Sequence, residues 1–175
     1  TAPTFVLDPA HTCIIWNRAL EELTGVKAID VIGTRDHGKA FYARQRPTLA
    51  DVIIDGNFEQ LPQLYGDVTP SALLAEGWPG EGWFDNLGGK KRYVLFDAAP
   101  IYNNKNALIA SIETLQDITD RKHVEQLKSD FVSMVSHQFK TPVAQVKGYL
   151  YNMLSGITGE LSAKQRLYLE EMLEI

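Results

Sequence analysis

The sequence has one cysteine among its 175 residues, no excess of basic charge and no long apolar run. The lone Cys13 cannot form an internal disulfide, and no Cys/His spacing of zinc type occurs, so we expect a reduced, cytoplasmic chain with no metal site. The 17 Lys and Arg residues against 22 Asp and Glu give a net charge of −5, which argues against nucleic acid as a partner. The longest uninterrupted apolar runs have only a handful of residues, such as 107–110, so no segment is expected to span a membrane.

Prolines are also scarce in the last third of the chain, because seven of the eight precede Ile118. The first part alternates short apolar runs with turns, which predicts an α+β domain. Short strands are expected at 5–8 and 13–17, a helix at 18–24 that ends at Gly25, a helical stretch at 47–54, and three late strands at 83–86, 91–101 and 107–115. Two strands, short helices and three more antiparallel strands together give a five-stranded sheet. Prolines and glycines between residues 57 and 82 predict a loop-rich insertion with short helices.

From Thr119 the apolar residues take on a helical period. The spacing of Val124, Leu127, Phe131 and Met134 predicts one helix of about 36 residues that runs to Ser155, roughly 54 Å long at 1.5 Å per residue. Glycines and the capping box Ser162-Ala-Lys-Gln then indicate a turn and a second helix. Each of the two helices then carries an apolar stripe. The simplest way to bury both stripes is for two chains to form a four-helix bundle.

One histidine of the long helix stands beside this stripe. In a heptad register with residues 124 and 131 in one core row, His137 falls next to the core, so its imidazole can reach the surface of a bundle. A neutral imidazole nitrogen is a competent nucleophile near pH 7 and can accept a phosphoryl group. Pro142 frees the carbonyl of Gln138 and is expected to bend the helix one turn beyond the histidine.

The stretch Phe131, then Ser136-His-Gln-Phe-Lys-Thr-Pro-Val143, resembles the phosphoacceptor box of sensor histidine kinases. The resemblance implies that His137 takes the γ-phosphoryl group of ATP and passes it to an aspartate on a response-regulator receiver domain. It also implies that Thr141 positions the water that hydrolyses the regulator's phosphoaspartate. Gln138 stands where the family usually has an acidic general base, and an amide can orient by hydrogen bonds but cannot take up a proton.

The first part of the chain resembles a PAS domain. The resemblance rests on Asn17 after the second strand, Gly33 after the second short helix, the three late strands, and the Asp-Ile-Thr junction at 117–119. It implies a sensor domain at 1–119 and a dimerisation and phosphotransfer hairpin at 120–175. The insertion at 57–82 departs from a compact PAS domain.

The ligand of such a sensor is not specified by the sequence. Candidate pocket residues are His37, Tyr42 and Trp16, with haem or an organic small molecule as the ligand. Flavin photochemistry is not expected, because Cys13 lies on an early strand and is interpreted as a small core residue.

The resemblance further implies partners that these 175 residues do not supply. No segment carries the glycine-rich boxes of the family's ATP-binding domain, and the second helix stops about 13 residues after its cap. The chain alone is therefore expected to be an inactive part of a histidine kinase, with ATP and Mg²⁺ held by the missing domain. The first residues, Thr-Ala-Pro, show neither a start Met nor a signal peptide, which predicts a piece of a longer protein and leaves an upstream membrane anchor open.

Two other functions remain open at this level. One is a ligand-binding dimerisation module with a vestigial histidine, for which Gln138 is the main support. The other, a DNA-binding helical hairpin, is disfavoured because residues 115–175 hold seven Lys and Arg against eight Asp and Glu and offer no basic face.

Overall fold

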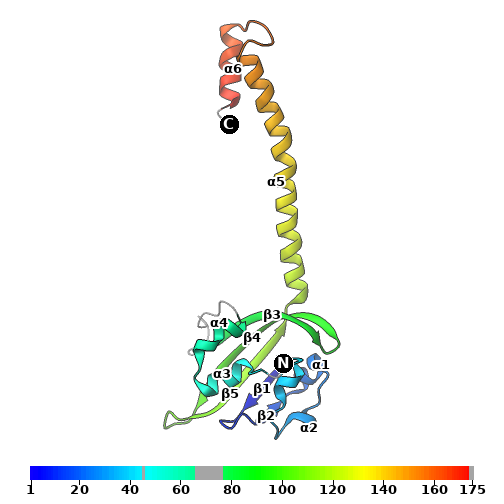
Figure 1. Ribbon diagram of the computed structural model, residues 1–175, viewed down its shortest axis with the longest axis vertical. Helices are drawn as coiled ribbons and strands as arrows, with labels where there is room; N and C mark the ends of the chain where they lie inside the picture. The colour runs from blue at the N-terminus through cyan, green and yellow to red at the C-terminus, as the bar shows by residue number, and fades with distance from the viewer. Residues whose placement is uncertain (45, 66–76, 174–175) are drawn as a thin grey trace. The chain divides into compact units, whose positions relative to one another are not determined.

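A five-stranded antiparallel sheet forms the framework of the first part of the chain in the computed structural model (Figure 1), which describes residues 1–44, 46–65 and 77–173. The strand order is β2-β1-β5-β4-β3, and every neighbouring pair is antiparallel. The strands are β1 (Thr4–Leu7), β2 (Cys13–Trp16), β3 (Trp78–Leu87), β4 (Lys90–Tyr102) and β5 (Leu108–Asp117). The prediction of a five-stranded α+β sheet is confirmed.

The start of β3 corrects one expectation. The strand begins at Trp78, five residues before the predicted start at Trp83, so residues 78–82 belong to the sheet and not to a loop-rich insertion. Pro79 and two glycines concealed this strand in the sequence. Proline is tolerated there because β3 lies at the edge of the sheet, where one side of the backbone has no strand partner. The insertion's residues 66–76 lie outside the described part.

Short helices cover one face of this sheet and enclose the core. They are α1 (Arg18–Thr24), α2 (Ala28–Val31), the 3₁₀ turns η1 (His37–Ala40) and η2 (Phe58–Gln60), α3 (Leu49–Asp55) and α4 (Leu61–Tyr65). Asn17 caps α1 by accepting a hydrogen bond from the amide of Leu20 at 2.9 Å, and Gly25 ends the helix with a φ of 76°. Alternate residues of β4, namely Val94, Phe96 and Ala98, point into the core that α3 closes from the other side.

The second part of the chain is helical. Helix α5 (Thr119–Leu154) has 36 residues, as its apolar period predicts, and remains helical on both sides of Pro142. Helix α6 (Ala163–Leu173) starts with the expected capping box, because Ser162 and Gln165 exchange hydrogen bonds of 2.9 and 3.3 Å. The chain divides into two compact units, Thr1–Lys122 and His123–Ile175. Among the described residues, no helix combines the length and apolarity needed to cross a membrane.

Candidate functional site

The candidate phosphoacceptor His137 lies in the middle of α5 with its side chain exposed. Thr141 follows four residues later, and residues four apart in an α-helix lie on the same face one turn from each other. The hydroxyl of Thr141 and the imidazole of His137 therefore face the same approaching partner. Neither the imidazole nor this hydroxyl has a hydrogen-bond partner within the described part of the chain, so both are available.

Gln138 and Pro142 form a second pair at the same spacing. Proline has no N–H to donate to the carbonyl of residue 138, so one helical hydrogen bond is missing directly beside the histidine. Gln138 is exposed, so its amide can reach a group bound at His137. The bend expected at Pro142 stays a prediction, since the helix continues through it.

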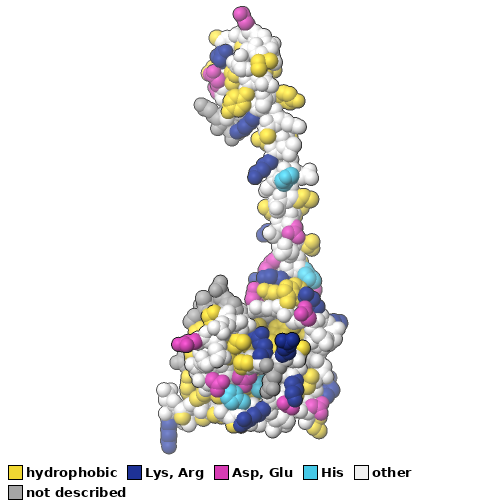
Figure 2. Space-filling view, viewed as in Figure 1, with side chains coloured by type: hydrophobic (Ala, Val, Ile, Leu, Met, Phe, Trp, Pro, Cys, Tyr) yellow, Lys and Arg dark blue, Asp and Glu magenta, His cyan; other side chains and the backbone are white. Residues whose placement is uncertain are grey.

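The apolar stripe of α5 is uncovered in a single chain. Val124, Leu127, Phe131 and Met134 are between 54% and 68% exposed, although each is an apolar side chain in a regular row. Figure 2 shows such hydrophobic side chains on the helical segment, interspersed with charged ones. A stripe with 3-4-3 spacing is the pattern that packs against another helix.

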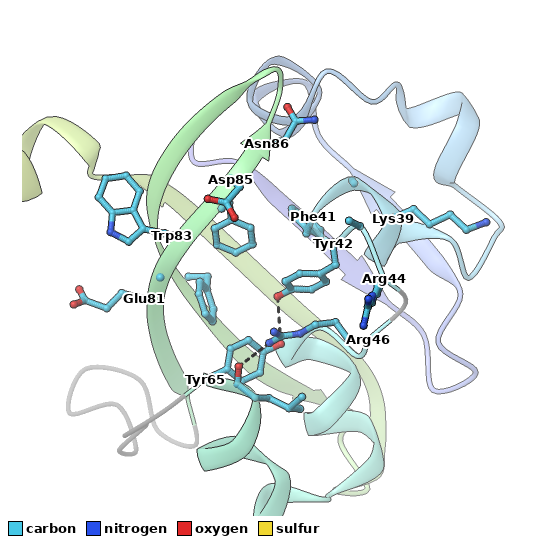
Figure 3. Close-up of a pocket in the computed structure, with 16 residues that line it drawn as sticks. Lys39, Phe41, Tyr42, Arg44, Arg46, Tyr65, Glu81, Trp83, Asp85 and Asn86 are labelled. Atoms are coloured by element: carbon cyan, nitrogen blue, oxygen red, sulfur yellow. Dashed lines mark hydrogen bonds between the residues drawn. The ribbon is translucent and has the colours of Figure 1, made fainter.

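A cavity of about 570 Å³ opens in the unit Thr1–Lys122, between residues 39–44 and 46, α4 and the strands β3 and β4. Tyr42 and Tyr65 line it, with the guanidinium of Arg46 between their rings at 4.3 and 4.8 Å from the ring centroids (Figure 3). Burial, together with the negative charge of Glu113, raises the pKa of Tyr42 to about 12, and burial also raises the pKa of Tyr65. Both phenols are therefore neutral near pH 7.

Of the three predicted pocket residues, only Tyr42 lines this cavity. Trp16 lies in the core, 4% exposed, and its indole N–H donates to the carbonyl of Val26 at 3.2 Å. His37 lies in η1, is 3% exposed, and borders a different cavity of about 330 Å³. The three residues therefore do not line one common cavity.

His37 belongs to a buried polar cluster around Asp51. The carboxylate of Asp51 lies 2.9 Å from Nε2 of His37 and 2.7 Å from Nδ1 of His11, and it accepts the amide N–H of Thr48 at 2.8 Å. Burial alone would raise the pKa of Asp51, but the bonds and charge of His37 outweigh it and hold that pKa well below its ordinary value. Nε2 of His37 is thus engaged by Asp51, while its buried Nδ1 has no hydrogen-bond partner among the described residues.

Cys13 is a core residue, as predicted. Its thiol is buried and donates to the carbonyl of Ile15 at 3.3 Å. Burial raises the pKa of this thiol to about 11, so the reactive thiolate is scarce near pH 7. Within the described residues, no group of three or more His, Cys, Asp or Glu side chains is arranged to hold a metal ion.

The junction between the sheet and α5 is held by an Asp-Ile-Thr turn. Asp117 forms an ion pair with Arg92 of β4 and accepts the amide N–H of Thr119 at 3.0 Å. The hydroxyl of Thr119 accepts the amide of Tyr93 at 2.9 Å, and the amide of Ile118 donates to the carbonyl of Tyr93 at 2.9 Å. The first residues of α5 are thus bonded to the neighbouring strand.

A second contact joins β3 to the first turn of α5. Glu81 accepts hydrogen bonds from the hydroxyl of Tyr93 at 2.9 Å and from Nζ of Lys122 at 3.2 Å, while this ammonium lies 4.6 Å from the Tyr93 ring centroid. The hydrogen bond from Tyr93 and the charge of Lys122 lower the pKa of Glu81, so it is ionised near pH 7. Glu81 also lines the cavity described above, so one residue touches both the cavity and the start of α5.

Four polar residues of these sites were not predicted from the sequence, namely Arg46, Asp51, Glu81 and Glu113. The position of Glu113 could have been predicted, because it lies two residues before Leu115 in β5 and residues two apart in a strand lie on the same, here buried, face. For Arg46 and Glu81 there was no such pattern, because their partners are brought to them only by the fold.

Two sequence families match the chain. The family model described as PAS domain matches residues 1–120, so the chain belongs to the PAS domain family. The family model described as His Kinase A (phospho-acceptor) domain matches residues 127–174, which include His137. A PAS domain followed by a phospho-acceptor domain is consistent with a fragment of a sensor histidine kinase.

Among curated proteins, sensor protein SrrB of Staphylococcus aureus (strain COL) is 35% identical to this chain over 49 residues. These residues are 28% of this chain but 8% of that protein, so the chain spans only a small part of such relatives. The solved structure of an RNA-binding light-oxygen-voltage receptor has the same fold, with a TM-score of 0.52 at 20% identity over 78% of this chain and 34% of that one. The PAS domain of Bordetella pertussis BvgS matches with a TM-score of 0.45 at 19% identity over 75% of this chain and 87% of that domain.

Proposed function

We propose that this chain is the signal-sensing and phosphoacceptor part of a sensor histidine kinase, in which His137 carries the phosphoryl group. The observation that carries the proposal is an exposed histidine in mid-helix, with Thr141 on the same face, inside the stretch that matches the phosphoacceptor domain. Two such chains would pair through the stripe that contains Leu127 and Phe131.

The proposed reaction is a phosphoryl transfer to an imidazole nitrogen. A neutral ring nitrogen of His137 attacks the γ-phosphorus of ATP, an N–P bond forms, the bond to the bridging oxygen breaks, and ADP leaves. The remaining ring N–H then loses its proton. Gln138 can accept a hydrogen bond from this N–H but cannot take the proton, so the proton passes to water.

The phosphoryl group then moves to an aspartate of a receiver domain. Its N–P bond breaks as an O–P bond to the aspartate forms, and His137 is regenerated. The hydroxyl of Thr141, one turn away, would position the water that later hydrolyses the phosphoaspartate. ATP and Mg²⁺ would be delivered by the kinase's ATP-binding domain. Because ATP and receiver domains are found in the cytoplasm, the proposed location of this function is the cytoplasm.

The sensor unit would act through the junction. A ligand or redox change at the sheet would alter residues 117–121, and a rotation or tilt of the paired α5 helices would present or withhold His137. The contacts that support this route are the ion pair of Asp117 with Arg92 and the bond of Glu81 to Lys122.

The competing function is a ligand-binding dimerisation module whose histidine receives no phosphate, and the substitution of an acid by Gln138 favours it. The test is to incubate the full-length protein, as the cell makes it, with γ-labelled ATP. We expect an acid-labile, base-stable label that His137→Ala abolishes and His123→Ala, on the same helix, leaves in place. Gln138→Glu should raise the initial rate about tenfold or more by supplying a base, whereas Gln145→Glu should not. If the protein takes up no such label, the histidine is vestigial and the chain is a ligand-binding dimerisation module.

A further inference from the structure

Arg46, in the wall of the 570 Å³ cavity, is a cation with no counter-charge among the residues that the structure describes. One of its terminal nitrogens donates to the carbonyl of Leu64 at 2.8 Å, and its guanidinium lies between the rings of Tyr42 and Tyr65. Its Nε is buried without a hydrogen-bond partner, and no carboxylate among the described residues forms an ion pair with it. Removing a charge from water without a partner is unfavourable, so the site is electrostatically incomplete.

The acidic residues that line the cavity do not supply this partner. Glu81 is bonded to Lys122, and Asp85 forms an ion pair with Lys91 at 3.3 Å. A second cation, Arg44, also lines the cavity. The unpaired charge of the cavity is therefore positive.

The remaining walls are aromatic. Phe84 stacks on Tyr42 with 5.8 Å between the ring centroids, and Phe96 lies 5.2 Å from Tyr65 and 6.1 Å from Phe84. Such a wall offers flat apolar surface for an aromatic ring, which gains from offset or edge contacts with its neighbours. A volume of about 570 Å³ also falls within the range that small-molecule sites have.

We propose that this cavity binds a small aromatic carboxylate, with its carboxylate on the guanidinium of Arg46 and its ring against Phe84 and Phe96. The guanidinium fork suits a planar carboxylate, because two parallel N–H donors can meet its two oxygens. The proposal rests on the sensor role given above and names the ligand class of that sensor.

A ligand in this cavity would touch residues that also contact the start of α5. Glu81 lines the cavity and holds Lys122, and Trp83 lines it and meets the ring of Tyr93 at 5.0 Å. Occupancy is thereby coupled to β3 and to the first turn of α5.

The test is isothermal titration calorimetry of the full chain with phenylacetate, 3-phenylpropionate and indole-3-acetate, which differ in size, and with phenylacetamide as the uncharged match of the first. At least one acid should bind, and the amide should bind about tenfold or more weakly than phenylacetate. Arg46→Gln should weaken acid binding about tenfold or more and Arg46→Lys less, whereas Arg18→Gln, on the exposed face of α1, should leave it unchanged.

Melting temperatures of the variants establish that each is folded, and the comparison of acid with amide needs no variant at all. Three acids that all fail to bind up to about 10 mM, equal affinities for phenylacetate and phenylacetamide, or undiminished binding to folded Arg46→Gln would each overturn the proposal. Because binding is read without phosphorylation, its failure is distinct from a failure of phosphotransfer at His137.

Discussion

Glu113 shows how a single buried acid can set the pH response of the sensor unit. Its side chain is 4% exposed in β5 and accepts the amide N–H of Ala50, in the first turn of α3, at 2.8 Å. Burial, reinforced by the negative charges of Asp51 and Asp97, raises the pKa of Glu113 to about 8, although the Ala50 bond opposes the shift. The residue is therefore mostly protonated at neutral pH in the folded protein and ionised in the unfolded chain.

This difference predicts a fall in stability as pH rises. Below the ordinary pKa of 4.5 both states hold the proton, while between 4.5 and about 8 only the folded state holds it, so the free energy of unfolding decreases by on the order of 1 kcal/mol per pH unit. Glu113→Gln keeps an acceptor for Ala50 and should remove this slope. Urea denaturation at pH 5, 6, 7 and 8 measures it.

Glu59→Gln, which neutralises an exposed glutamate, serves as the matched control and should keep the wild-type slope. Parallel stability curves for wild type and Glu113→Gln would contradict the assignment of a buried, proton-holding carboxyl at this position.

At the scale of elements, the turn between β3 and β4 is fixed by its contact with α1. Gly88 has a φ of +61°, and a Cβ built on it would lie 2.4 Å from the carbonyl oxygen of Leu23. Gly89 has a φ of +79°, but a Cβ there would meet nothing within 4 Å. Substitutions at these two positions therefore distinguish two losses of stability. At Gly89 only the backbone is strained, whereas at Gly88 the new side chain also collides with α1.

Gly89→Ala should lower the free energy of unfolding by about 1 kcal/mol through the left-handed backbone alone. Gly88→Ala should lower it by about 3 kcal/mol or more, because α1 or the turn must also move. Chemical denaturation of both variants measures the difference. Equal losses would show that the close approach to Leu23 does not constrain the turn.

Most elements could be predicted from local patterns, because those patterns are set by neighbours in the sequence. The short apolar runs that alternate with turns predicted the late strands, and the period from Val124 to Met134 predicted α5. The start of β3 was missed because Pro79 is excluded only from central strands, and the sequence does not show which strand lies at an edge.

The candidate site divides in the same way. His137, Gln138, Thr141 and Pro142 lie within one helical turn and a half, so a short sequence pattern can describe them. No short sequence pattern can predict the surroundings of Arg46, because Tyr65 and Phe84 come from distant segments of the chain. The bond of His37 to Asp51 could not be predicted for a related reason, since the two residues lie on different elements, η1 and α3.

At the scale of the whole molecule, the exposed stripe of α5 predicts a dimer. Phe131→Asp places a charge in the centre of the stripe and should shift the chain to monomers in sedimentation velocity. Ser129→Asp, at the outward position of the same heptad register, should leave the dimer intact. A wild-type chain that sediments as a monomer, or a dimer unaffected by Phe131→Asp, would contradict helical pairing through this stripe.

We propose that the sensor unit sets the rate at which His137 is phosphorylated, through the contact of Glu81 with Lys122. The most direct test is the initial rate of labelling from γ-labelled ATP in a double-mutant cycle of Glu81→Gln and Lys122→Met, with Lys128→Met as the control. We predict that each single substitution changes the rate about two- to fivefold in the same direction, that the double variant goes no further, and that the control matches wild type. Wild-type rates in all variants, or effects of the two substitutions that simply add, would contradict the claim.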